Sequence, residues 1–336
     1  MTADRKRVLL AIALAVAATA AVVVLIGQAA HFGELAKRLR EAAPGWLVVC
    51  AAGELVAYAG YIAAYQAMAQ VSGGPRLAPV TAARVVGLAF GAFSVATAVG
   101  GLSVDFWALR EAGEPAALAS ARVIAFETLR WAVMAVVTCI AAVAALAGVG
   151  HHIPWVVPAG WLALAGLCFA GGIWVSAPAR RERFGVDSGG RLRRALGVAV
   201  TALVFIRQLR ASPPGMRARA IGGSGLFWLG ELGCAWAAVR SFGPSLSLAP
   251  LVVGYATGYL STGLPLPFGG SGGVDAAMTG GFVLAGAPLS GALVGAVVFR
   301  VFSFWAPALI AALSVTTVRG LRDRLLDVAE RRRQVS

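Results

Sequence analysis

The chain has 336 residues, of which 59% are hydrophobic and 13% are charged, and its mean hydropathy is +0.79. Soluble domains contain about 45–50% apolar residues, so the composition excludes a soluble domain and indicates a single integral membrane domain over 1–336. The chain has a net charge of +14, and a strongly positive charge is common in nucleic-acid-binding proteins. Here the basic residues lie in loops between apolar segments and form no nucleic-acid-binding module, so we exclude nucleic acid as a partner.

Six apolar segments are long enough to cross a bilayer, which takes about 20 apolar residues. The first begins at Val8 and is longer than the core of a signal peptide, so we expect an uncleaved transmembrane helix there. The six predicted transmembrane helices cover 8–28, 45–70, 118–147, 155–176, 219–242 and 289–316.

Two further apolar stretches, 80–113 and 249–287, are each interrupted by glycines and then carry an acid. The second contains GLPLPFGGSGGVDAAMTGG, in which Gly269 and Gly270 precede Asp275. Backbone that leaves helical geometry at membrane depth must be surrounded by protein or line a water-filled cavity. We therefore expect two re-entrant helical hairpins, each made of two half-helices that enter and leave on the same side.

The distribution of basic residues predicts the orientation, because Lys and Arg collect on the cytoplasmic side. Residues 5–7 are basic and the loop 177–218 is rich in arginine, whereas the loops 148–154 and 243–250 contain neither Lys nor Arg. We predict a cell-membrane protein whose termini and basic loop are cytoplasmic. Within that loop, 189–210 has arginines at both ends of an apolar middle, which fits a helix in the interface plane or a short span.

Two units of the chain, 45–147 and 219–316, share features in the same order. These features are GEL at 53–55 and 230–232, an acid after a glycine pair at Asp105 and Asp275, and an arginine 25 residues later at Arg130 and Arg300 (130 − 105 = 300 − 275). The predicted topology gives the two units opposite orientations. Inverted repeats with broken helices are typical of transporters, in which half-helix ends and unwound backbone supply the binding site.

Seven charged residues fall inside predicted membrane segments, where each costs at least about 2.5–3.5 kcal/mol on insertion scales. Two interpretations are open. The charges form internal ion pairs, Glu127 with Arg130 and Arg300 with one of two glutamates, or they line a polar cavity in which the arginines bind an anionic headgroup, since the arginine fork suits phosphate. The candidate site residues are Arg130, Arg300, Glu127, Glu54, Glu231, Asp105 and Asp275, together with Gly269 and Gly270, whose backbone break exposes N–H groups.

The position of Asp275 has its own two interpretations. An acid in the first turn of a helix can cap it and is favoured by the helix dipole. The alternative is a carboxyl group that titrates during transport.

Motifs of catalysis are missing from the sequence. There is no recognisable Ser–His triad, no spacing of metal ligands and no phosphate-binding loop of the nucleotide type, because GGSGG lacks the GK[ST] that would follow. The four cysteines lie singly in apolar segments. We therefore expect a protein that is not an enzyme and holds neither metal nor cofactor.

The segment PLPFGGSGGVDAAMTGGFVLAGAPLSGALVGAVVFRVFSFWAPALI, residues 265–310, resembles the C-terminal signature of the lysylphosphatidylglycerol synthase transmembrane family. The first hairpin, VGGLSVDFWALR with the later FETLRW, resembles the family's first signature. The chain differs in having Asp275 where the family usually has Glu, Val99 near an expected proline and Ser103 in place of a glycine. The resemblance extends from about residue 10 to 318.

The resemblance implies movement of a modified phospholipid or polyprenyl-linked lipid between leaflets. We expect no lipid aminoacylation by this chain, because no aminoacyl-transferase domain follows Thr317. Two alternatives stay open. One is a membrane-embedded headgroup transferase with Asp105 or Asp275 as general base, and the other is a protein that delivers lipid to a separate synthase through the loop 177–218.

Overall fold

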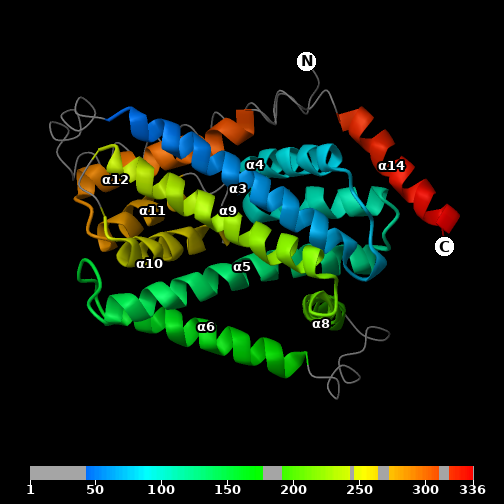
Figure 1. The fold of residues 1–336 in the computed structure, drawn as a ribbon, viewed down its shortest axis with the longest axis horizontal. Coiled ribbons are helices and arrows are strands. Elements are labelled where there is room, and N and C mark those ends of the chain that lie inside the picture. Colours follow the sequence, from blue (N-terminus) through cyan, green and yellow to red (C-terminus); the bar gives the residue numbers. More distant parts are fainter. Residues whose placement is uncertain (1–42, 177–190, 243–245, 264–271, 310–317, 336) are drawn as a thin grey trace.

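The computed structural model describes residues 43–176, 191–242, 246–263, 272–309 and 318–335, and these residues form helices with no strand among them (Figure 1). The all-α prediction is therefore confirmed. The helices are α3 (Gly45–Gln70), α4 (Pro79–Glu111), α5 (Ala116–Leu146), α6 (Val156–Val175), α8 (Arg191–Leu209), α9 (Pro214–Arg240), α10 (Leu248–Tyr259), α11 (Gly273–Leu284), α12 (Leu289–Arg300) and α14 (Val318–Val335), with short helical turns η1 (Val71–Gly73), η3 (Leu260–Gly263) and the π-helical η5 (Val301–Trp305).

Among the described residues, four helical stretches are long and apolar enough to cross a membrane: Gly45–Gly73, Ala116–Leu146, Val156–Val175 and Leu289–Leu309. They correspond to four of the six predicted spans, and the chain is a polytopic all-α membrane protein. Helix α9 covers the fifth predicted span and has 27 residues, but its glycines and charged residues make it less apolar than these four. The first predicted span, 8–28, lies outside the described residues.

Helices α3 and α9 lie side by side and antiparallel in the middle of the molecule (Figure 1). A Cβ atom on Gly53 would lie 2.8 Å from the carbonyl oxygen of Gly230, and one on Gly60 would lie 2.5 Å from that of Gly223. Such close backbone approach requires glycine, and small residues commonly form the contact between membrane helices. The two GEL segments therefore meet where these helices cross.

Helix α4 folds back on itself, as the glycine break predicts. A Cβ atom on Gly101 would lie 3.4 Å from the carbonyl oxygen of Ala89, and one on Gly100 would collide with that of Ala92. Twelve residues of straight helix would separate the first two positions by about 18 Å. The chain therefore reverses between these residues, and the element is an antiparallel pair of helical arms.

Helices α10 and α11 form the second hairpin. A Cβ atom on either Gly254 or Gly281 would collide with the carbonyl oxygen of the other, and one on Gly258 would lie 2.9 Å from the Cα atom of Met278. The two helices are therefore antiparallel and in tight backbone contact. The connection 264–271, which contains Gly269 and Gly270, lies outside the described residues.

The connections gather at two ends of the bundle, on the right and on the left in Figure 1. At the first, which we call the basic end, the α3–α4, α4–α5 and α8–α9 connections meet α14, and arginines are frequent. At the opposite end, the backbone N–H of Ala43 donates to the carbonyl of Ser241 at 3.1 Å, and Gly286 packs against His151. Both outer ends of the α4 hairpin lie at the basic end, and those of the α10–α11 hairpin lie at the opposite end.

Helix α8 runs across the long helices, and Figure 1 shows it end-on beside α5 and α6. It is amphipathic, with Phe205 and Leu209 buried, and it is not one of the four membrane-crossing stretches. The prediction of a helix in the interface plane fits this placement better than the alternative of a short span.

Candidate functional site

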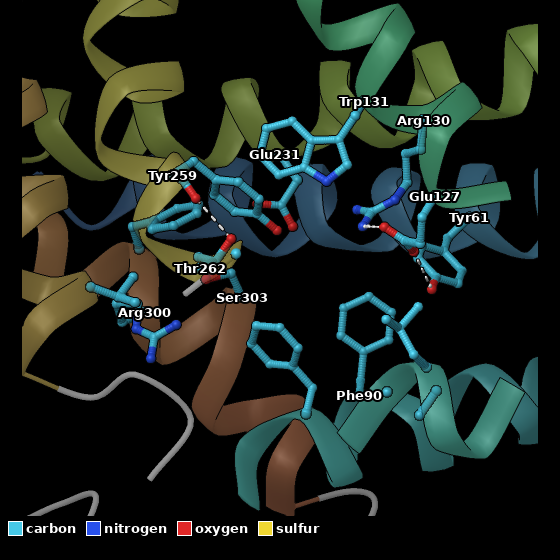
Figure 2. Close-up of a pocket in the computed structure, with 17 residues that line it drawn as sticks. Tyr61, Phe90, Glu127, Arg130, Trp131, Glu231, Tyr259, Thr262, Arg300 and Ser303 are labelled. Atoms are coloured by element: carbon cyan, nitrogen blue, oxygen red, sulfur yellow. Dashed lines mark hydrogen bonds and ion pairs between the residues drawn. The ribbon is translucent and has the colours of Figure 1, made fainter. Parts of the chain in front are cut away.

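A cavity of about 100 Å³ lies where the tips of the two hairpins converge between α3, α5, α9 and α12 (Figure 2). The first hairpin contributes Phe90 and Leu102, and the second contributes Tyr259 and Val274. We call it the central cavity. The described residues that line it are Tyr61, Ala89, Phe90, Phe93, Gly101, Leu102, Glu127, Arg130, Trp131, Glu231, Tyr259, Thr262, Gly263, Val274, Phe299, Arg300 and Ser303.

Arg130 of α5 forms one wall of the central cavity. Its guanidinium makes an ion pair with Glu127, one helical turn earlier, as the spacing predicts. The guanidinium carbon lies 4.6 Å from the ring centre of Phe227, and the indole N–H of Trp228 donates to the Arg130 carbonyl at 2.7 Å. Nε of Arg130 is buried and has no hydrogen-bond partner among the described residues.

Arg300, at the end of α12, forms the wall opposite Arg130 (Figure 2). Its Nε donates to Oδ1 of Asp275 at 2.9 Å, and both side chains are at least 95% buried. The π-helical turn begins immediately after Arg300. Pro307 explains a disturbance here, because it has no N–H to donate to the carbonyl of Ser303 four residues earlier.

Asp275 holds Arg300 from the first turn of α11. Its Oδ2 accepts the backbone N–H of Gly272 at 2.9 Å, so the capping interpretation is confirmed. Gly272 has φ 87°, a left-handed conformation that favours glycine. The same carboxylate therefore fixes both the start of the helix and the position of the arginine.

Asp105 occupies the corresponding position in the first unit but has a different environment. It is 1% exposed, and its Oδ2 accepts the hydroxyl of Tyr61 at 3.4 Å. Its Oδ1 has no hydrogen-bond partner among the described residues. The Tyr61 hydroxyl also lies 3.4 Å from Oε1 of Glu127, so its one hydrogen is shared between the two acids while Arg130 pairs with Glu127.

Glu231 lies between the two arginines in Figure 2 and lines the central cavity. It accepts the hydroxyl of Tyr255 at 2.8 Å. Glu54 follows Gly53 at the crossing of α3 and α9, is 6% exposed and does not line the cavity. The expectation that Arg300 pairs with Glu54 or Glu231 is replaced by the ion pair with Asp275, which the hairpin brings alongside α12.

The predicted site residues therefore divide into four groups. Four of them line one shared cavity, two acids lie directly behind it, one lies beside it in the α3–α9 contact, and two lie outside the described residues. In that order they are Glu127, Arg130, Glu231 and Arg300; Asp105 and Asp275; Glu54; and Gly269 and Gly270.

The aromatic residues of the site are not predicted by the sequence patterns. Tyr61, Trp131 and Tyr259 line the cavity beside its charged side chains. A hydropathy pattern does not distinguish such aromatic residues from the other apolar residues of a transmembrane helix. One signal was available, since Tyr61 follows Glu54 by seven residues and so falls on the same helix face. Trp131, next to Arg130 in sequence, carried no comparable signal.

The described residues contain no group of three His, Cys, Asp or Glu side chains that could hold a metal ion. What the central cavity offers is two guanidinium groups on opposite walls, partly neutralised by carboxylates and enclosed by aromatic rings. Arginine guanidinium groups bind phosphate and carboxylate through paired hydrogen bonds. The arrangement therefore suits a small anionic group shielded from bulk water.

Comparison with known proteins gives a family. A family model described as the lysylphosphatidylglycerol synthase TM region matches residues 8–311, a range that includes both hairpins and every candidate site residue. No curated protein matches the chain. The chain belongs to the lysylphosphatidylglycerol synthase transmembrane family.

Proposed function

We propose that this protein translocates an anionic amphipathic lipid, a phospholipid or a polyprenyl-linked lipid, between the leaflets of the cell membrane. Its headgroup passes through the central cavity while its chains stay in the bilayer. Membership of a family of lipid-related membrane regions supports a lipid as the substrate class. The two arginines support an anionic headgroup, because an arginine fork binds phosphate.

One observation carries this proposal. The tips of two hairpins that open toward opposite ends of the bundle line the same cavity, with Arg130 and Arg300 on facing walls. If each hairpin is re-entrant from its own side of the membrane, moving one or the other exposes a fixed polar site to alternate leaflets. Carriers built from inverted repeats work in this way.

The inverted repeat and the orientation are parts of the same proposal. Close contact at Gly53 and Gly230 supports two units, 45–147 and 219–316, that meet at equivalent positions. We propose that the basic end is cytoplasmic, because arginines gather there, and that both termini lie on that side.

Headgroup transfer is less well supported than transport. A general base must have a carboxylate oxygen available to its substrate, but Asp275 accepts hydrogen bonds from Arg300 and Gly272. Asp105 is buried behind Tyr61 and does not line the cavity. We therefore propose a carrier without catalytic chemistry. A partner enzyme that supplies the lipid would contact the loop 177–218.

The test is lipid flipping in proteoliposomes that contain the purified protein. The panel is labelled phosphatidylglycerol, aminoacyl-phosphatidylglycerol, a polyprenyl phosphate and phosphatidylcholine as the zwitterionic comparison. We expect transport of at least one anionic lipid. Arg130→Lys and Arg300→Lys should each slow it about tenfold or more, because lysine keeps the charge but loses the paired hydrogen bonds.

Exposed Arg324, outside the central cavity, provides the control, and Arg324→Lys should leave the rate unchanged. The proposal fails if no anionic lipid moves faster than in protein-free vesicles. It also fails if transport survives both cavity substitutions in a protein that still elutes as a folded species.

A further inference from the structure

A second cavity, of about 760 Å³, lies at the basic end and shares no lining residue with the central cavity. Its walls are the α3–α4 connection, the α8–α9 connection and the last turns of α14. We call it the basic cavity. It is lined by Gln70, Ser72, Gly73, Gly74, Arg76, Ser212, Pro213, Met216, Val328, Arg331 and Arg332.

The walls of the basic cavity are tied together by side chains. The hydroxyl of Ser72 donates to Oε1 of Gln208 at 2.6 Å, which joins the α3–α4 connection to α8. Ser72 has φ 54° and is the one non-glycine residue with positive φ in the described part of the chain. Such backbone strain persists only where surrounding contacts fix it. The α3–α4 connection is therefore held against α8 at this wall of the cavity.

Helix α14 closes the cavity from the other side. Its inner face carries Leu321, Leu325 and Val328, whose side chains are buried and anchor the helix on the bundle. Arg332 donates to Glu114 at 2.7 Å and to the carbonyl of Gly73 at 3.0 Å. This arginine is therefore held in place at the cavity wall.

The charge at this site is strongly positive. Among the described residues that line it, every charged one is an arginine. Glu114 lies behind the wall, 1% exposed, and its single carboxylate already meets two guanidinium groups, those of Arg122 at 2.7 Å and Arg332 at 2.7 Å. Arg76 and Arg331 are exposed and form no ion pair within the described residues. Among the described residues the lining thus carries three arginines, and the acid behind it, Glu114, is already shared by Arg122 and Arg332.

The geometry points to a binding site for a phosphate group, separate from the central cavity, with Arg76 and Arg331 as its recruiting guanidinium groups and Arg332 as its fixed one. Guanidinium groups recognise phosphate through charge-assisted hydrogen bonds. The phosphate belongs either to a soluble phosphorylated molecule or to a lipid headgroup at the adjacent membrane surface. Binding would tie α14 more firmly to the α3–α4 connection, because the ligand would contact both.

The experiment uses the full chain purified in a phosphate-free buffer. Inorganic phosphate and pyrophosphate are titrated against the protein in micelles at constant ionic strength. Thermal unfolding is also compared in nanodiscs of phosphatidylcholine with and without phosphatidylglycerol. The variant is Arg76→Gln with Arg331→Gln, because both residues are exposed and neither holds α14 in place. Its control is Arg219→Gln with Arg324→Gln, which removes the same charge from exposed arginines outside the lining.

We expect the cavity variant to weaken binding of at least one probe by about tenfold or more, while the control variant binds like the wild type. An effect on soluble phosphate alone identifies a soluble ligand, and loss of the phosphatidylglycerol effect identifies a lipid headgroup. If the cavity variant and the control variant respond equally to both probes, or if neither probe acts on the wild type, the proposal is wrong. Lipid transport is measured separately, so its failure leaves this result unaffected.

Discussion

Asp275 and Asp105 occupy equivalent positions in the two units, but the structure gives them different roles in stability. Asp275 pairs with Arg300 at 2.9 Å, and the two side chains are 1% and 5% exposed. Replacing Asp275 by Asn removes the carboxylate that pairs with the buried guanidinium of Arg300. Removing one partner of a buried pair costs about 3–5 kcal/mol. The asparagine side chain still has an oxygen to accept the N–H of Gly272, so the helix cap contributes little to this loss.

Asp105→Asn is the matched comparison. No ion pair is lost, because Arg130 pairs with Glu127, and the amide oxygen still accepts the hydroxyl of Tyr61. We therefore expect the free energy of unfolding to change by no more than about 1 kcal/mol, the net contribution of an ordinary hydrogen bond.

Unfolding of both variants in mixed micelles, followed by tryptophan fluorescence, measures the difference. A double variant, Asp275→Asn with Arg300→Gln, completes a mutant cycle that isolates the pair. We expect it to recover most of the lost stability, because a neutral pair needs no countercharge. Equal destabilisation by Asp105→Asn and Asp275→Asn, or an additive cycle, would refute the reasoning that the buried ion pair makes the difference.

Two further substitutions test the contacts that position the site. Gly254→Ala should destabilise the protein by about 1–3 kcal/mol, because its Cβ atom would collide with the backbone of α11, whereas Gly280→Ala, with nothing within 4 Å, should unfold like the wild type. Glu114→Gln should release the last turns of α14, because Arg332 loses its carboxylate, while Leu321 and Leu325 keep the start of the helix buried. The same change removes the carboxylate paired with buried Arg122. Faster cleavage within 318–335 by limited proteolysis would show the release, and an unchanged cleavage rate would contradict it.

The features predicted correctly from the sequence are those fixed by neighbouring residues. The three-residue spacing of Glu127 and Arg130 sets their helix face, and the ion pair follows. The two glycine-interrupted stretches predict chain reversal, and the contacts of Gly101 with Ala89 and of Gly254 with Gly281 agree with antiparallel arms. That the two hairpins are re-entrant stays a prediction. Asp275 at the start of a half-helix predicts its cap.

Features that depend on how distant segments meet were not predictable from these patterns. The partner of Arg300 is set by the hairpin that lays α11 along α12, so the sequence alone could not choose among three acids. The burial of Leu321 and Leu325 on the inner face of α14 was also not predicted from the sequence, because arginines dominate the composition of that segment. The basic cavity follows from that docking and was missed with it.

The two arginines of the central cavity differ because of one residue. At the spacing that relates Asp105 to Asp275, the counterpart of Glu127 is Val297 (297 − 127 = 275 − 105). Arg130 therefore has a carboxylate on its own helix, and this local pair leaves its Nε without a partner among the described residues and Asp105 without an ion pair. Arg300 has no such neighbour and is held by the acid of the facing hairpin. If the central cavity takes an anionic headgroup, as we propose, that headgroup would meet on one wall a guanidinium held by the facing hairpin and on the other a guanidinium paired within its own helix.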